Sequence, residues 1–111
     1  MRNRFGLFET DLQNVVAVLN QFPEVEHASV FGSRAKGNFK NGSDVDIALK
    51  GKQLSFMIVA RINSILNEET SMPYKFDVVN YETITNNELK EHIDRVGLVI
   101  YNKNNSSIHV K

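Results

Sequence analysis

The chain has 111 residues, of which 41% are hydrophobic and 23% charged, and its formal net charge at pH 7 is zero. This length predicts one domain over residues 1–111, with a core spanning about 8–101. A zero net charge does not favour a broad surface that binds nucleic acid directly. The lack of cysteine excludes disulfides and thiolate metal sites. No apolar stretch approaches the roughly 20 residues of a membrane span, and residues 1–5 do not resemble a secretory signal, so we expect a cytoplasmic protein.

Predicted helices and strands alternate along the chain. Apolar residues at helical spacing predict an amphipathic helix over residues 8–21, ended by Pro23. Four segments rich in β-branched and aromatic residues predict strands: 25–31, 45–50, 74–80 and 98–101. A helix containing residues 54–66 separates the second and third strands. The last helix contains Leu89, Ile93 and Val96, with Thr85 or Asn86 as N-cap and Gly97 as C-cap. Residues 102–111 are polar and are expected to form a mobile tail.

This alternation predicts an α/β layered domain, in which helices pack on a sheet around one core. The middle helix is apolar on nearly all sides from Phe56 to Val59. Such a helix is either deeply buried or docked on a partner, and the sequence leaves both open.

Two aspartates occupy alternate positions at the second predicted strand. Asp44 and Asp46 flank Val45, so their side chains project from one face, with Cα atoms about 6.5 Å apart. A buried carboxylate is costly unless it is paired or binds a metal, and Mg²⁺ prefers oxygen ligands of this kind. The competing interpretation is that Asp44 caps a turn and Asp46 lies at a hydrated strand edge.

A third aspartate, Asp77, lies between Phe76 and Val78 in the third predicted strand. If that strand lies beside the second, about 4.8 Å away, Asp77 joins the same carboxylate cluster. Otherwise it pairs with Lys75 or Arg61 at a sheet edge.

The loop after the first strand begins with Gly32 and Ser33. Glycine allows a phosphate to approach the backbone, and Ser33 offers a hydroxyl; Arg34 and Lys36 would add positive charge. A P-loop is excluded because Gly37 is followed by asparagine and phenylalanine. The alternative is a polar surface loop with both cations in solvent. The three histidines have no ligand spacing, and we assign none of them to a metal.

Taken together, Gly32-Ser33, ten residues, Asp44-x-Asp46 and a later strand carboxylate resemble the DNA polymerase β-like nucleotidyltransferase superfamily. The segment FGSRAKGNFKNGSDVDIAL, residues 31–49, resembles its minimal nucleotidyltransferase (MNT) branch. The resemblance covers about residues 10–101 and implies a mixed sheet with helices packed on one face. It also implies that the three aspartates hold two Mg²⁺ ions and that Gly32 and Ser33 contact the terminal phosphates of ATP.

The resemblance further implies transfer of AMP to a hydroxyl, with a HEPN-domain toxin as partner and a toxin tyrosine as acceptor. The protein would then be the antitoxin of the pair. Two alternatives are an antitoxin that only masks its toxin and a nucleotidyltransferase acting on a small molecule such as an aminoglycoside. The complete set of carboxylates argues against the first, and the lack of an acceptor-binding domain argues against the second. Homo-oligomerisation stays open.

Overall fold

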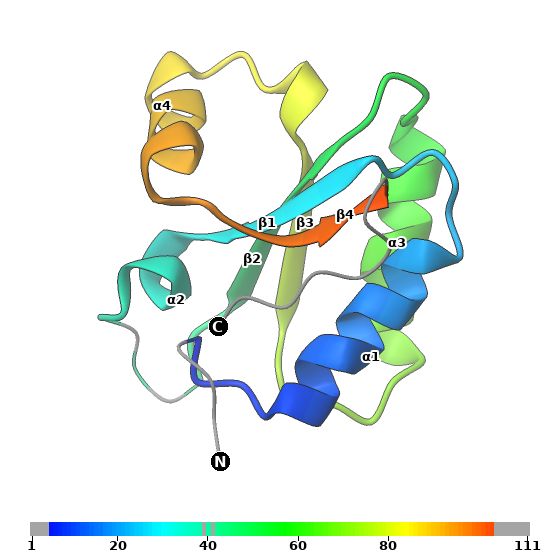
Figure 1. Ribbon diagram of the computed structural model, residues 1–111, viewed down its shortest axis with the longest axis vertical. Helices are drawn as coiled ribbons and strands as arrows, with labels where there is room; N and C mark the ends of the chain where they lie inside the picture. The colour runs from blue at the N-terminus through cyan, green and yellow to red at the C-terminus, as the bar shows by residue number, and fades with distance from the viewer. Residues whose placement is uncertain (1–4, 39, 41, 104–111) are drawn as a thin grey trace.

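The computed structural model describes residues 5–38, 40 and 42–103. The elements in chain order are α1 (Glu9–Asn20), β1 (His27–Phe31), α2 (Gly32–Lys36), β2 (Val45–Lys50), α3 (Phe56–Glu68), β3 (Phe76–Asn80), the 3-10 turn η1 (Tyr81–Thr83), α4 (Asn87–Val96) and β4 (Leu98–Asn102) (Figure 1). All predicted helices and strands are present. None of the helices in these described ranges is long and apolar enough to cross a membrane.

The ends of α4 and β4 show where the sequence prediction succeeded and failed. Asn86 caps α4 by accepting hydrogen bonds from two backbone N–H groups, and Gly97 is its C-cap, as predicted. The predicted mobile tail was wrong at its start. Asn102 belongs to β4, and the Lys103 N–H donates to the Glu26 carbonyl at 2.9 Å. The remainder of that predicted tail, 104–111, lies outside the described residues.

The four strands form one mixed sheet in the order β3-β2-β1-β4. β1 runs antiparallel to both β2 and β4, whereas β2 and β3 are parallel and are connected through α3. The parallel register places Asp46 opposite Asp77 and Ile47 opposite Val78. The sheet therefore pairs two of the predicted site residues directly.

Helices cover both faces of this sheet (Figure 1). α1 and α3 cover one face, which receives alternate residues of β2 such as Val45 and Ile47. α4 packs on the other face, where Ile93 joins Phe31 and Ala48 in a smaller apolar cluster. The expectation of helices on one face is thus right for α1 and α3 and wrong for α4. The α/β class and the mixed sheet are confirmed.

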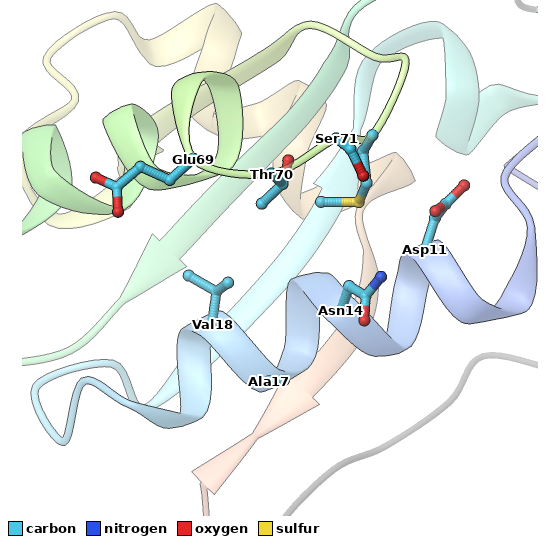
Figure 2. A pocket seen from close by; sticks show the side chains of 8 residues that line it. Asp11, Asn14, Ala17, Val18, Glu69, Thr70 and Ser71 are labelled. Carbon is cyan, nitrogen blue, oxygen red and sulfur yellow. The ribbon is translucent and has the colours of Figure 1, made fainter.

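A hollow of about 430 Å³ separates α1 from the segment that follows α3 (Figure 2). Asp11, Asn14 and Val18 line it from α1, and residues 69–72 line it from the opposite side. The Tyr74 hydroxyl donates to Asp11 Oδ2 at 2.9 Å and links the two sides. The hollow lies on the α1–α3 side of the sheet, away from the face that carries Asp46.

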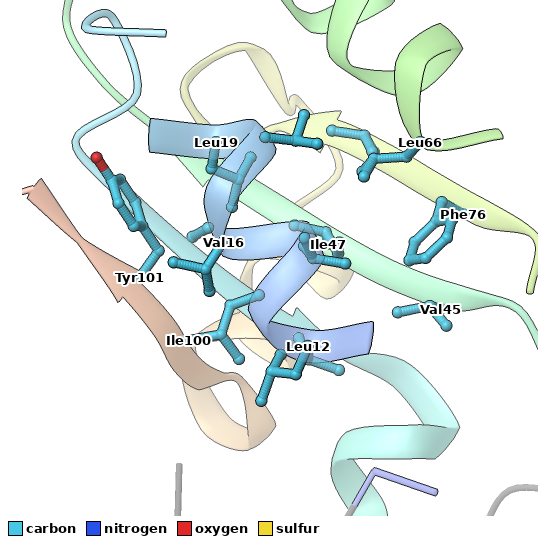
Figure 3. Packing of buried hydrophobic residues seen from close by; sticks show 14 of the residues in the cluster. Leu12, Val16, Leu19, Val45, Ile47, Leu66, Phe76, Ile100 and Tyr101 are labelled. Carbon is cyan, nitrogen blue, oxygen red and sulfur yellow. The ribbon is translucent and has the colours of Figure 1, made fainter. Parts of the chain in front are cut away.

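The main core lies between α1, α3 and the sheet (Figure 3). Because side chains alternate across a strand, β2 sends its apolar residues into this core and Asp46 to the opposite face. Burying one such aliphatic side chain contributes roughly 1.5–3 kcal/mol. This core therefore fixes which way the carboxylates project. Fully buried members include Leu12, Leu19, Ile47, Ile62, Leu66 and Ile100.

The outer edge of β3 is held by two asparagines of α3. Asn67 Nδ2 donates to the Phe76 carbonyl at 2.9 Å, and its Oδ1 accepts from the Phe76 N–H at 2.8 Å. Asn63 Oδ1 accepts from the Val78 N–H at 3.2 Å. These bonds satisfy backbone groups that an edge strand otherwise leaves open. They fix β3 on either side of Asp77.

We expect Asn67→Ala to lower the free energy of unfolding by about 1–3 kcal/mol, because it leaves both backbone groups of Phe76 without their partner. Asn14→Ala, on the exposed side of α1, is the matched control and gains the same helix propensity. Chemical denaturation of both variants measures the difference. Equal free energies of unfolding in the two variants would show that the hydrogen bonds of Asn67 to Phe76 do not stabilise the protein.

Candidate active site

Three aspartates meet at one end of the β2–β3 pair. Asp46 and Asp77 are register partners on adjacent strands, and Asp44 directly precedes β2. Asp46 is half-buried, and the other two are exposed. The parallel pairing therefore brings the three predicted site residues to one end of the two strands, with Asp46 on the face opposite α1 and α3.

The electrostatics of Asp46 reflect this crowding. Burial raises the pKa of its carboxyl above the ordinary value, and the negative charges of Asp77 and Asp44 raise it further. The ion pairs that the described residues form are Arg61–Glu69 and Arg95–Glu91. The proposed pairing of Asp77 with Arg61 is therefore not found, and the described cations leave the cluster without a salt bridge.

Three carboxylates that form no ion pair with a cation of the described residues are a donor set of hard oxygen atoms, which suits Mg²⁺. Within the described ranges, no three acidic, histidine or cysteine side chains converge as a ready-made metal group. Mutual repulsion explains this spacing, and the exposed side chains of Asp44 and Asp77 have room to turn toward Asp46.

Gly32 packs directly against this cluster. It is the first residue of α2 and has a φ of +73°, in the left-handed region that favours glycine. A Cβ atom at Gly32 would overlap Oδ2 of Asp46. The positive φ favours glycine here, and any side chain at position 32 would push the Asp46 carboxylate out of its place.

The remaining predicted loop residues follow Gly32 within α2. The loop begins with the short helix α2, which runs from Gly32 to Lys36 and is ended by Gly37 with a φ of +84°. Ser33 is half-buried next to Gly32, whereas Lys36 is exposed in the last turn. Ser33 therefore follows the residue that lies against Asp46, whereas Lys36 faces solvent.

Arg34 has a different environment from the one that the sequence suggested. Its side chain is only 3% exposed, and its Nε and Nη2 donate to the Ser43 carbonyl at 3.1 and 2.9 Å. Its Nη1 donates to the Phe5 carbonyl at 2.7 Å, and its guanidinium lies 5.5 Å from the centre of the Tyr74 ring. These contacts hold the residue before Asp44 and do not support the expected contact with a nucleotide.

His92 also contacts this site, and no pattern in the sequence indicated it. The N–H of Gly32 donates to His92 Nε2 at 3.2 Å, although the two residues are 60 positions apart. No spacing pattern identifies this pair, because the contact depends on α4 packing over the sheet. His92 also makes an edge-to-face contact with Phe31, with ring centres 6.1 Å apart.

The apolar start of α3 is a second feature near β3. Phe56 is 84% and Met57 74% exposed, so deep burial of this run is wrong for its first two residues. A groove of about 490 Å³ runs beside Phe56 and Val59 along residues 78–80 of β3. The strand that carries Asp77 therefore borders an exposed apolar surface.

Comparison with known proteins places this geometry in a family. Residues 13–106 match the model of the family described as polymerase beta, nucleotidyltransferase. The chain belongs to this nucleotidyltransferase family. It is also 31% identical over 94 residues to the "Probable protein adenylyltransferase MntA" of Haemophilus influenzae, covering 84% of this chain and 81% of that protein.

Several solved structures share this fold. One is described as tri-AMPylated Shewanella oneidensis HEPN toxin in complex with MNT antitoxin, with a TM-score of 0.65 and 15% identity over 87% of this chain and 74% of that one. A toxin–antitoxin structure with AMP-PNP matches with a TM-score of 0.65 and 19% identity over 84% and 72% of the two chains. A structure described as the toxin-antitoxin MntA-HepT matches with a TM-score of 0.66 and 15% identity over 88% and 75%.

We expect Gly32→Ala to abolish binding of Mg²⁺–ATP, because its Cβ would displace the Asp46 carboxylate. Gly37→Ala is the matched control, since Gly37 also has a positive φ but a Cβ atom there would have open space around it. Both variants should lose about 1–2 kcal/mol from the left-handed backbone. Calorimetric titration with Mg²⁺–ATP measures the difference, and equal affinity in the two variants would contradict it.

Without metal, we expect Asp46→Asn to raise the melting temperature at pH 7.5. The raised pKa of Asp46 means that its contribution to stability is fully present at low pH and is lost as the pH rises through the folded-state pKa. The gain should therefore shrink as the pH falls toward 4.

Adding Mg²⁺–ATP should reverse this order, because only the wild type keeps the Asp46 carboxylate that we expect to bind the metal. Melting curves with and without Mg²⁺–ATP measure both effects. An asparagine variant that is less stable than wild type in metal-free buffer at pH 7.5 would contradict the repulsion argument.

Proposed function

We propose that this nucleotidyltransferase transfers AMP from ATP to a tyrosine hydroxyl of a HEPN-domain toxin and thereby acts as an antitoxin. The observation that carries the proposal is the pairing of Asp46 with Asp77, with Asp44 and Gly32 beside them. The named function of the Haemophilus influenzae relative and the AMPylated toxin in the matched Shewanella oneidensis complex support it.

In this proposal Asp44, Asp46 and Asp77 hold two Mg²⁺ ions. When bound, the metal ions neutralise phosphate charge and stabilise the attacking and departing oxygens. The Ser33 hydroxyl donates a hydrogen bond to a terminal phosphate of ATP. Gly32, which has no side chain, allows the backbone to come close to that phosphate. Lys36, which is exposed, is available to add positive charge near the phosphates.

The reaction is an in-line displacement at the α-phosphorus of ATP. The acceptor hydroxyl oxygen forms a bond to that phosphorus, and the bond to the bridging oxygen of the β-phosphate breaks, releasing pyrophosphate. Asp77 accepts the hydroxyl proton, because it is the exposed member of the register pair and lies on the edge strand.

A protein acceptor suits this site better than a small molecule. Asp44 and Asp77 are exposed, and the apolar surface at Phe56 and Met57 continues along β3 as a groove. Exposed apolar patches of this kind mark protein–protein contacts. The same surface would also serve an antitoxin that only masks its toxin, so catalysis needs its own test.

We expect Asp77→Asn to bind the toxin while losing AMP transfer, because the change removes a charge and leaves the shape intact. After co-expression, intact-mass spectrometry should show toxin heavier by one or more AMP units with wild type, and unmodified toxin with the variant. Toxicity should persist with the variant.

Asp11→Asn is the control, since Asp11 is a half-buried aspartate on the opposite face and can keep an acceptor for the Tyr74 hydroxyl. It should transfer AMP as wild type does. Full protection by Asp77→Asn without added mass would identify masking as the mechanism and refute the transfer.

A further inference from the structure

We propose that His92 is a positioning residue of the nucleotide site: its imidazole accepts from the Gly32 N–H and so holds the Phe31–Gly32 peptide, from which the chain turns into Ser33 and the phosphate-binding segment. This inference rests on the proposed function, because the orientation matters for catalysis only if nucleotide binds there. The contact itself is a property of the protein without ligand and can be tested separately.

The first observation is the hydrogen bond between Gly32 N–H and His92 Nε2, at 3.2 Å. Because Nε2 accepts this bond, it carries no hydrogen atom, and the imidazole acts as a neutral acceptor. A neutral acceptor adds no negative charge beside Asp46, whose carboxyl is already disfavoured by burial and by two further carboxylates. An acidic side chain at position 92 would accept the same bond but increase that repulsion.

The second observation is that Gly32 is confined from two sides, at its N–H and at its Cα. His92 holds its N–H, and the Asp46 carboxylate lies where a Cβ of Gly32 would be. With a φ of +73°, Gly32 has more backbone freedom than any other residue type, so an unheld peptide here could rotate. Rotation would redirect the N–H and hydroxyl of Ser33, the next residue.

The third observation is that the imidazole is itself fixed. Phe31 contacts it edge to face, with ring centres 6.1 Å apart and an interplanar angle of 77°. Ile93, the next residue of α4, is 4% exposed and packs with Phe31 and Ala48. Because α4 packs on the sheet, the imidazole of His92 has a fixed position, and it keeps the Gly32 N–H in place at the start of the phosphate-binding turn.

A purely structural role would make His92 a packing residue between α4 and Phe31. His92→Leu keeps an apolar side chain there but has no acceptor. His92→Gln places an amide oxygen near the position of Nε2 and restores the acceptor without the ring. His27→Leu is the matched control, since His27 is a half-buried histidine at the opposite end of β1.

Direct detection in the wild type needs no substitution. An NMR experiment that reads scalar coupling across N–H···N hydrogen bonds should correlate the Gly32 amide nitrogen with His92 Nε2. Hydrogen exchange of the Gly32 amide should be about tenfold faster in His92→Leu, and His92→Gln should stay close to wild type. His27→Leu should leave the exchange unchanged.

Binding of Mg²⁺–ATP, measured by calorimetry, should weaken about tenfold in His92→Leu and recover in His92→Gln, with all variants still cooperatively folded. No coupling in the wild type, or equal loss of affinity in the leucine and glutamine variants, would overturn the positioning role. A wild type that binds no Mg²⁺–ATP would refute the proposed function instead, and the coupling and exchange would still decide whether His92 holds Gly32.

Discussion

The parallel pairing of β2 with β3 forces two carboxylates into adjacent positions on the sheet, and the neighbouring structure accommodates that repulsion. Asp46 and Asp77 are register partners, and the carboxyl of Asp46 is both partly buried and surrounded by like charge. A protein retains such an arrangement at a cost in stability. In a metal-dependent nucleotidyltransferase, a cation bound between the carboxylates and the phosphates offsets this repulsion.

The residues around the carboxylates position them without neutralising them. Asn63 and Asn67 fix β3 by its backbone on both sides of Asp77. Arg34 is close in sequence to the site, yet its guanidinium is directed at carbonyl oxygens and holds the loop before Asp44. His92 reaches Gly32 as a neutral acceptor. Each of these contacts uses amides, carbonyls or an imidazole, so none of them neutralises the negative charge of the carboxylates.

The two faces of the sheet separate stability from chemistry. The α1–α3 face holds the large apolar core, and the face with Asp46 is only partly covered by α4. This division allows the site to remain open to a large acceptor while the core keeps the strands in register. The exposed apolar start of α3 lies beside β3, the strand that carries Asp77 and also contributes to the core.

Local sequence patterns predicted much of this protein. The alternation of helices and strands, the caps of α4 and the period-two placement of Asp46 opposite the core all follow from interactions between residues close in sequence. The glycine-serine turn and the spaced aspartates likewise pointed to a nucleotide site and to the family. These features are readable because turn chemistry and side-chain periodicity act over a few residues.

Only the tertiary structure decided how these parts meet. The sequence did not reveal that α4 packs on the second face of the sheet. An amphipathic helix can pack its apolar side on either face, and the sequence pattern does not say which. The same packing brings His92 to Gly32 across 60 residues, and the folding of the loop buries Arg34 against carbonyls that no local pattern connects to it. The need for glycine at position 32 also became specific only in three dimensions, where the Asp46 carboxylate occupies the space of a side chain. Contacts between distant residues are set by the packing of whole elements, and a single sequence carries no local record of them.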